Sequence, residues 1–197
     1  KPGAVLIDMT TTSPKLSERI YAEAKPRGIS ALDAPVSGGD SGAKAGTLSI
    51  MVGGDEADFE AIVPMFQAFG KSINYMGPAG CGQHTKAANQ ICVAGATAAY
   101  TEAIIYAQKV GLDPEKMLQA ISGGAAGSWQ INNMAPRALH GDHAPGFFIK
   151  HFVKDMRIVK SEAAAKGVDL EMLDSVLGLY EKMMERGYEN DGTQALI

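Results

Sequence analysis

The sequence predicts an α/β fold that passes into an all-helical part. Two observations support this. Over residues 1–78, short β-rich segments alternate with helical segments, which is typical of a largely parallel sheet covered by helices. After Gly77-Pro78 the strand patterns stop, and residues 79–197 carry only helical periodicity. We therefore predict two domains, residues 1–78 and residues 79–197, connected by a long helix.

The first half contains the signals of four strands and two helices. Residues 4–7 form a continuous apolar run, as expected of a strand that is buried on both faces. Ser13 is a suitable N-cap for a helix that Pro14 begins, and apolar residues follow at helical spacing. The other predicted elements are strands at residues 29–34, 47–52 and 72–76 and a helix over residues 55–69.

The second half opens with a long alanine-rich helix. This helix is predicted from residue 80 to about residue 110, and Gly111 follows its end. Asp113 and Pro114 are a favourable N-cap and first residue for the next helix. Further helices are predicted near residues 128–140, 151–166 and 170–187.

Composition and charge argue against several function classes. Apolar residues make up 46% of the chain and charged residues 20%, and the net charge is −4, so a basic face for nucleic acid is not expected. No apolar run approaches the roughly 18 residues of a membrane span. Cys81 and Cys92 are isolated, and the four histidines lack metal-ligand spacing. We expect a cytoplasmic protein without a nucleic-acid, membrane or metal partner.

The first segment that could bind a ligand is Asp33-Ala34-Pro35-Val36-Ser37-Gly38-Gly39, directly after a predicted strand. Its two glycines let backbone N–H groups approach a ligand, and Ser37 adds a hydroxyl donor. Such a loop suits a carboxylate. A tight turn with a capping serine explains the same residues, and local chemistry alone favours that simpler interpretation.

The second segment is Gly80-Cys81-Gly82-Gln83-His84-Thr85-Lys86-Ala87-Ala88-Asn89, at the start of the long helix. Lys86 and Asn89 are three residues apart and share a helix face. Small and apolar neighbours would desolvate the lysine and lower its pKa toward a range useful for proton transfer. By spacing alone, a surface lysine is the commoner explanation. In a third segment, Phe152-Val153-Lys154-Asp155, a solvated ion pair is the default interpretation.

Together these segments resemble, in order and along the whole chain, the β-hydroxyacid dehydrogenases. This family contains 3-hydroxyisobutyrate dehydrogenase and tartronate semialdehyde reductase (2-hydroxy-3-oxopropionate reductase). The run that ends at Asn89 is similar to the family's G-x-G-x-x-x-K-x-x-N signature. The resemblance implies that Lys86 is the catalytic lysine and that Asn89 holds the substrate beside it. It also implies that Ser37, Gly38 and Gly39 bind the substrate carboxylate.

The resemblance further implies a cofactor, NAD or NADP. Thr11, at the end of the first predicted strand, would contact the nicotinamide ribose, and Lys154 would reach the cofactor. The family's fold is a Rossmann-type parallel sheet followed by an all-α domain. No G-x-G-x-x-G fingerprint occurs in these 197 residues. We therefore expect an N-terminally truncated chain, holding the C-terminal part of the Rossmann domain, that by itself binds dinucleotide poorly.

The implied reaction is hydride transfer between NAD(P) and a short 3-hydroxy acid or its semialdehyde. The alanine-rich long helix with apolar faces separately suggests a homodimer or homotetramer. Residues 122–128 look closer to the tartronate semialdehyde reductases than to the 3-hydroxyisobutyrate enzymes, so tartronate semialdehyde is the expected substrate. The alternatives are 3-hydroxyisobutyrate and succinic semialdehyde or 4-hydroxybutyrate.

Two other functions fit the sequence less well. The 6-phosphogluconate dehydrogenases share the Ser-Gly-Gly loop and the lysine, but they have a His-Asn pair where this chain has Ala88-Asn89, and a longer helical domain. A non-enzymatic dimerisation or chromatin-reader module would not need Lys86. An inactive fragment that lacks the dinucleotide fingerprint is the remaining alternative.

Overall fold

The computed structural model describes residues 1–197, which form two compact units, Lys1–Asn89 and Gln90–Ile197. The division falls inside the longest helix, α4 (Cys81–Lys109), so this helix supplies residues to both units. The strand pattern ends earlier in the chain, near residue 78, where the last strand of the first unit ends. Each unit has its own core and is described by itself.

A mixed five-stranded sheet forms the centre of the first unit. Its strands are β1 (Val5–Asp8), β2 (Ser30–Asp33), β3 (Val36–Ser37), β4 (Leu48–Gly53) and β5 (Gly70–Gly77). The order is β1-β2-β4-β3, and β5 also pairs with β4. The pairs β1–β2 and β4–β5 are parallel, whereas β4 runs antiparallel to both β2 and β3. The predicted α/β class is confirmed, with a sheet that is mixed where the chain turns back through β3.

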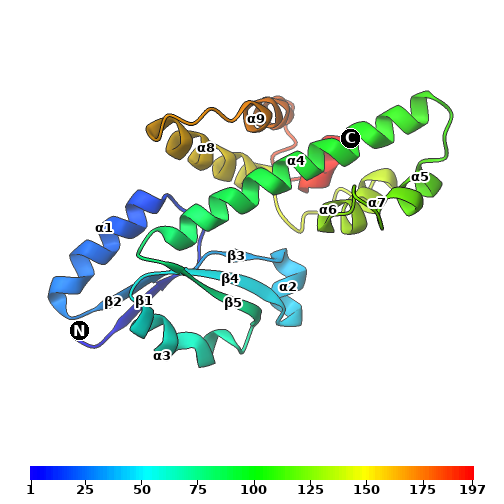
Figure 1. Ribbon diagram of the computed structural model, residues 1–197. Helices are drawn as coiled ribbons and strands as arrows, with labels where there is room; N and C mark the ends of the chain where they lie inside the picture. The colour runs from blue at the N-terminus through cyan, green and yellow to red at the C-terminus, as the bar shows by residue number, and fades with distance from the viewer. The chain divides into compact units, whose positions relative to one another are not determined.

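Helices cover both faces of this sheet (Figure 1). The helices of the first unit before α4 are α1 (Pro14–Ala24), α2 (Gly39–Ala45) and α3 (Glu56–Phe66), with a 3₁₀ turn, η1 (Lys25–Arg27), after α1. As predicted, Ser13 caps α1, and its Oγ accepts a hydrogen bond from the Leu16 N–H at 3.2 Å. Helices α1 and α3 lie on opposite sides of the sheet, and the core between the sheet and α3 is built around Ile50, Val52 and Phe66.

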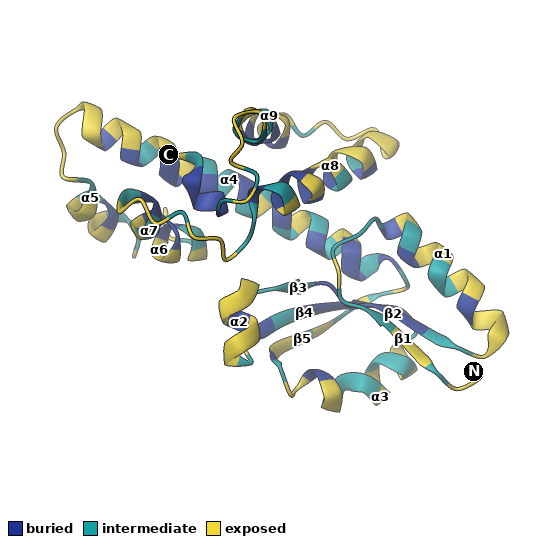
Figure 2. Cartoon of the chain, turned by 180° about the vertical axis from the view of Figure 1, so that it is seen from behind, coloured by how far each residue is buried: buried dark blue, intermediate teal, exposed yellow.

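Strand β1 departs from its prediction. Val5 and Leu6 are 42% and 47% exposed, so the expectation that this strand is buried on both faces was wrong (Figure 2). The physical reason is its place in the sheet, because β1 lies at an edge and pairs only with β2. An apolar run indicates a strand, but the neighbouring elements determine how much of it is covered.

The second unit is all-helical, as predicted. After its part of α4, it contains α5 (Pro114–Ile121), α6 (Trp129–Asn133), α7 (Ala135–Leu139), α8 (Ile149–Ala165), α9 (Glu171–Glu185) and a 3₁₀ turn, η2 (Thr193–Leu196). One helix was expected near residues 128–140, but it is broken at Met134, two residues before Pro136, which has no N–H for the helical ladder.

Two groups of buried side chains hold the second unit together. Tyr100 and Ile104 of α4 pack with residues of α5, α6 and α7. Phe152 of α8 meets Tyr180 of α9 edge to face, with ring centroids 5.1 Å apart. On α9, Leu173, Val176, Leu177 and Tyr180 form the buried face and are at most 4% exposed. No helix in the structure has the length and apolar character needed to cross a membrane.

Candidate active site

Lys86 lies on the second turn of α4, within the first unit, and only 8% of it is exposed. A surface lysine, the commoner explanation by spacing, therefore does not describe it. Asn89 lies three residues further along and is half-buried. Both residues make interactions, and their three-residue spacing places them on one face of the helix.

A buried carboxylate fixes the start of α4. Asp33 stands at the carboxyl end of β2 and is 3% exposed. Its Oδ1 accepts a hydrogen bond from the Gly80 N–H at 2.8 Å, and its Oδ2 accepts one from the Gln83 N–H at 2.9 Å. These donors are among the N–H groups that a helix leaves without an internal partner at its N-terminus, where negative charge is also favoured. Asp33 therefore anchors the helix that carries Lys86 to the sheet.

Two glycines make this close approach possible. A Cβ at Gly82 would lie 2.4 Å from the Met51 carbonyl oxygen and 2.8 Å from Asp33 Oδ2. A Cβ at Gly53 would lie 2.6 Å from Asp33 Oδ1 and 2.8 Å from the Gly82 nitrogen. Any side chain at either position would push α4 away from β2 and β4. The second glycine of the predicted signature, Gly82, thus has a packing role in this unit.

Gln83 ties the loop after β1 to the same helix turn. Its Nε2 donates to the Thr10 carbonyl oxygen at 2.7 Å, and its Oε1 accepts from the Thr12 N–H at 3.1 Å. Gln83 is 2% exposed, and the half-buried Thr11 stands between the two residues that it binds. The side chain of Asp8 supports the loop further, because its Oδ1 accepts from the Thr10 N–H at 3.0 Å and from its hydroxyl at 2.6 Å.

Sequence reasoning missed the parts played by Asp33 and Gln83. Both residues stand inside the two segments singled out from the sequence, so a signal for their importance was present. Their partners are 47 and 73 residues away along the chain, for Gly80–Asp33 and Gln83–Thr10 respectively. Residue spacing carries no information about such contacts.

The predicted carboxylate-binding segment is partly regular structure. Ser37 lies in β3 opposite Ser49, and Gly39 begins α2. Gly38 and Gly39 have φ values of +132° and +62°, a region in which residues with a Cβ are strained. Ser37 does not cap α2, because the N-cap position belongs to Gly38 and no side chain bonds there. The turn of the chain before α2 therefore requires both glycines.

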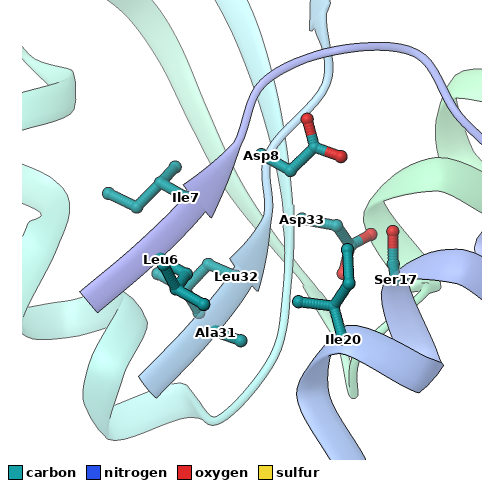
Figure 3. Close-up of a pocket in the computed structure, with 8 residues that line it drawn as sticks. All are labelled: Leu6, Ile7, Asp8, Ser17, Ile20, Ala31, Leu32 and Asp33. Atoms are coloured by element: carbon teal, nitrogen blue, oxygen red, sulfur yellow. The ribbon is translucent and has the colours of Figure 1, made fainter. Parts of the chain in front are cut away.

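A pocket of about 270 Å³ is lined by residues of β1, β2 and α1 (Figure 3). Its walls are mostly apolar, with Asp8, Ser17 and Asp33 as polar groups. The Asp8 and Asp33 carboxylates are bound to Thr10 and to the start of α4. We therefore do not place the substrate there. The lining residues are Leu6, Ile7, Asp8, Ser17, Ile20, Ala31, Leu32 and Asp33.

In the second unit, Lys154 lies beside a buried carboxylate. Its Nζ lies 2.9 Å from Oδ1 of Asp155, a residue whose side chain is 2% exposed, while the lysine side chain is 48% exposed. Gln90 Nε2 donates to the other carboxylate oxygen of Asp155 at 2.6 Å. The pair is therefore not a fully solvated one, as the default interpretation assumed. Gln90, the residue directly after Asn89, was not singled out from the sequence.

A cysteine thiol and a metal ion are two other kinds of reactive group that an active site can use. Burial, with the nearby charges of Asp33 and Glu18, raises the pKa of the Cys81 thiol, which keeps it in its unreactive protonated form. No group of three or more His, Cys, Asp or Glu side chains is placed to hold a metal ion. Neither the Cys81 thiol nor a metal cluster therefore stands out as a reactive group at the start of α4.

Both parts of the chain match known protein families. Residues 80–197 match the family described as the NAD-binding region of NADP-dependent 3-hydroxyisobutyrate dehydrogenase. Residues 1–77 match the NAD-binding domain of 6-phosphogluconate dehydrogenase.

Individual relatives agree with these matches. An oxidoreductase of Bacillus subtilis is 52% identical over 196 residues, covering 100% of this chain and 68% of that protein. The 2-hydroxy-3-oxopropionate reductase of Escherichia coli is 42% identical, covering 99% of this chain and 67% of the relative. The 3-hydroxyisobutyrate dehydrogenase of Mycobacterium tuberculosis, solved with L-serine, is 30% identical with a TM-score of 0.91, covering 100% and 69%. The chain spans about two thirds of the length of these three proteins.

Proposed function

The chain belongs to the family of NAD(P)-dependent 3-hydroxyacid dehydrogenases that includes 3-hydroxyisobutyrate dehydrogenase, and on this basis we propose that Lys86 transfers the proton in its reaction. The substrate is a short 3-hydroxy acid or the corresponding semialdehyde. The observation that supports the role of Lys86 is its burial, at 8% exposure, one helical turn beyond the anchored start of α4.

The protein's own groups bind the substrate and move a proton. The nicotinamide supplies or accepts the hydride. In reduction, Lys86 Nζ donates a proton to the aldehyde oxygen, and in oxidation it assists removal of the hydroxyl proton. Ser37, with the backbone N–H groups of Gly38 and Gly39, holds the carboxylate. Asn89, on the same helix face as Lys86, orients the substrate.

Thr11 and Lys154 are the proposed cofactor contacts, each within its own unit. Thr11 suits a ribose hydroxyl because the backbone on both of its sides is bound by Gln83. Lys154 keeps its cation partly exposed while Asp155 holds its Nζ at 2.9 Å. A hydroxyl donor and a cation are the kinds of group that a dinucleotide requires of its protein.

Replacement of Lys86 tests the proposal. In the full-length protein, Lys86→Ala should lower kcat at least about a hundredfold while the Kd for the cofactor changes little, because a positioned acid–base group contributes on the order of 10²–10⁴ in rate. Steady-state kinetics and a cofactor titration measure the two effects. Lys71→Ala, which changes an exposed lysine of β5, is the matched control and should behave as wild type. A kcat for Lys86→Ala within a few-fold of wild type would end the assignment.

For the specific substrate we propose tartronate semialdehyde. The resemblance of residues 122–128 supports this choice, and a 2-hydroxy-3-oxopropionate reductase is among the relatives, at 42% identity. The alternatives are 3-hydroxyisobutyrate and succinic semialdehyde or 4-hydroxybutyrate. A panel of these compounds, each assayed with NADH and NADPH or their oxidised forms, would rank them by kcat/KM. A higher value for any alternative replaces tartronate semialdehyde.

We also propose that the protein is a homodimer or homotetramer. Tyr106, Val110 and Leu112, at the end of α4 and just beyond it, are 66%, 52% and 53% exposed, and exposed apolar side chains are typical of contact surfaces. Light scattering coupled to size exclusion measures the mass. A monomeric mass at micromolar concentration would contradict the proposal.

A further inference from the structure

We infer that Gln83 is a positioning residue, whose side-chain amide sets the place of Thr11 relative to Lys86. This inference rests on the proposed function, in which Thr11 contacts the cofactor and Lys86 moves the proton. All three residues lie within the first unit. Gln83 is 2% exposed, and both polar atoms of its side chain are hydrogen-bonded to the loop after β1.

The chemistry of the contact requires a primary amide. Gln83 donates from Nε2 to the Thr10 carbonyl oxygen and accepts at Oε1 from the Thr12 N–H. A planar amide presents one donor and one acceptor side by side, which matches a carbonyl and an N–H of the same loop. A carboxylate lacks the donor, and an apolar side chain of similar length lacks both. The carboxylate leaves the Thr10 carbonyl without its donor, and the apolar side chain leaves both part-buried backbone groups without their partners.

The contact restrains Thr11 from both sides. The two bonded residues immediately precede and follow Thr11, so its backbone cannot shift without straining one of the bonds. The backbone N–H of Gln83 is itself held by Asp33 Oδ2 at 2.9 Å, which prevents the amide from moving with the loop. The loop, the sheet and the first turn of α4 are therefore joined through one residue.

The same helix turn sets the position of Lys86. Gln83 and Lys86 are three residues apart and lie on neighbouring parts of one face of α4. The positions of Thr11 and Lys86 are thus both set by the first turns of α4. Because a misplacement of about 1 Å can reduce a rate about a hundredfold, a residue that sets this spacing affects the reaction without touching the substrate.

The test compares Gln83→Met with Gln83→Glu in the full-length protein. We expect Gln83→Met to speed amide hydrogen exchange at Thr12, and to raise the Kd for NADH or NADPH, each by at least about tenfold, with a lower kcat. The KM for the semialdehyde should stay close to wild type, because the carboxylate-binding segment is untouched. Gln108→Met, which changes an exposed glutamine of α4, is the matched control and should alter none of these values.

The pH profile of Gln83→Glu distinguishes positioning from general destabilisation. A protonated glutamic acid again offers one donor and one acceptor, whereas the carboxylate does not. Cofactor affinity of Gln83→Glu should therefore recover toward wild type as the pH is lowered from 8 to 5, relative to wild type at each pH. If Gln83 only stabilised the fold, the cofactor affinity of the folded Gln83→Glu protein would equal that of wild type at every pH, with the folded fraction followed by circular dichroism.

Several results would overturn the inference. One is a Gln83→Met protein whose Thr12 exchange and cofactor Kd both remain within about twofold of wild type. Faster Thr12 exchange with unchanged cofactor binding and kcat would show a structural bond only. If Gln83→Met does not fold, the pH profile of Gln83→Glu decides the matter. A wild-type protein that binds cofactor but reduces none of the semialdehydes refutes the proposed function, while Thr12 exchange and cofactor affinity still report on Gln83.

Discussion

At the scale of single residues, Asp33 accepts hydrogen bonds that water would accept at an exposed helix N-terminus. Its two carboxylate oxygens accept from Gly80 and Gln83, and the residue is 3% exposed. Bonds to a charged acceptor are stronger than bonds between neutral groups, and here they also complement the positive end of the helix. The same carboxylate therefore determines where α4 begins and where its first turn lies on the sheet.

We predict that Asp33→Ala is strongly destabilising. Two buried N–H groups lose their acceptor, which should lower the free energy of unfolding by about 2–4 kcal/mol. Urea unfolding followed by circular dichroism measures this change. Asp40→Ala is the control, because it removes only an exposed ion pair with Lys44 and should cost less than about 0.5 kcal/mol. An equally small loss for Asp33→Ala would mean that water replaces the carboxylate.

At the scale of elements, short helices of the second unit are joined by side chains near their ends. His140, the C-cap of α7, lies with Nδ1 2.7 Å from the Pro136 carbonyl oxygen and with Nε2 3.0 Å from Glu115 Oε1 of α5. The hydrogen bond to the Pro136 carbonyl, followed by the contact with Glu115, raises the pKa of His140. Protonation of this histidine therefore favours the contact between α5 and α7.

We predict that the α5–α7 contact weakens as the pH rises. Since the pKa of His140 is higher in the folded than in the unfolded chain, its stabilising effect is complete below the unfolded pKa and is lost as the pH rises through the folded pKa. Glu115→Gln should lower the pKa of His140, measured by NMR titration of its ring protons. Glu102→Gln, an exposed acid of α4, should leave that titration unchanged. An unaltered His140 titration in Glu115→Gln would contradict the prediction.

At the scale of the whole molecule, the two units share one helix. Residues up to Asn89 of α4 belong to the first unit, and residues from Gln90 onward belong to the second. A helix is a continuous ladder of hydrogen bonds, so loss of one part exposes and frays the next. The two units are thus linked through the backbone of α4 itself.

We predict that the units unfold together. Under mild denaturing conditions, Asp33→Ala should reduce amide protection in β4 of the first unit and also in α9 of the second. Hydrogen exchange followed by mass spectrometry measures both, and Asp40→Ala should change neither. Faster exchange in β4 with unchanged exchange in α9 would mean that the units unfold independently.

The sequence determined the elements whose signals are local. Ser13 and Asp113 mark the starts of α1 and α5, and the structure has side-chain caps at both positions. Apolar periodicity located α9, and the loss of strand patterns near residue 78 separated the sheet from the helices. The order of the motifs indicated the family, which the comparisons confirm. The roles assigned to Lys86 and the other site residues stay predictions.

Only the tertiary structure decided which groups meet. It exposed Val5 and Leu6 at a sheet edge, and it placed Ser37 in a strand inside what the sequence suggested was a loop. It also joined Asp33 and Gln83 to partners 47 to 73 residues away. Caps and periodicity depend on residues a few positions apart, which the chain order specifies. Burial and long-range hydrogen bonds depend on which segments pack together, and that is settled only when the whole chain folds.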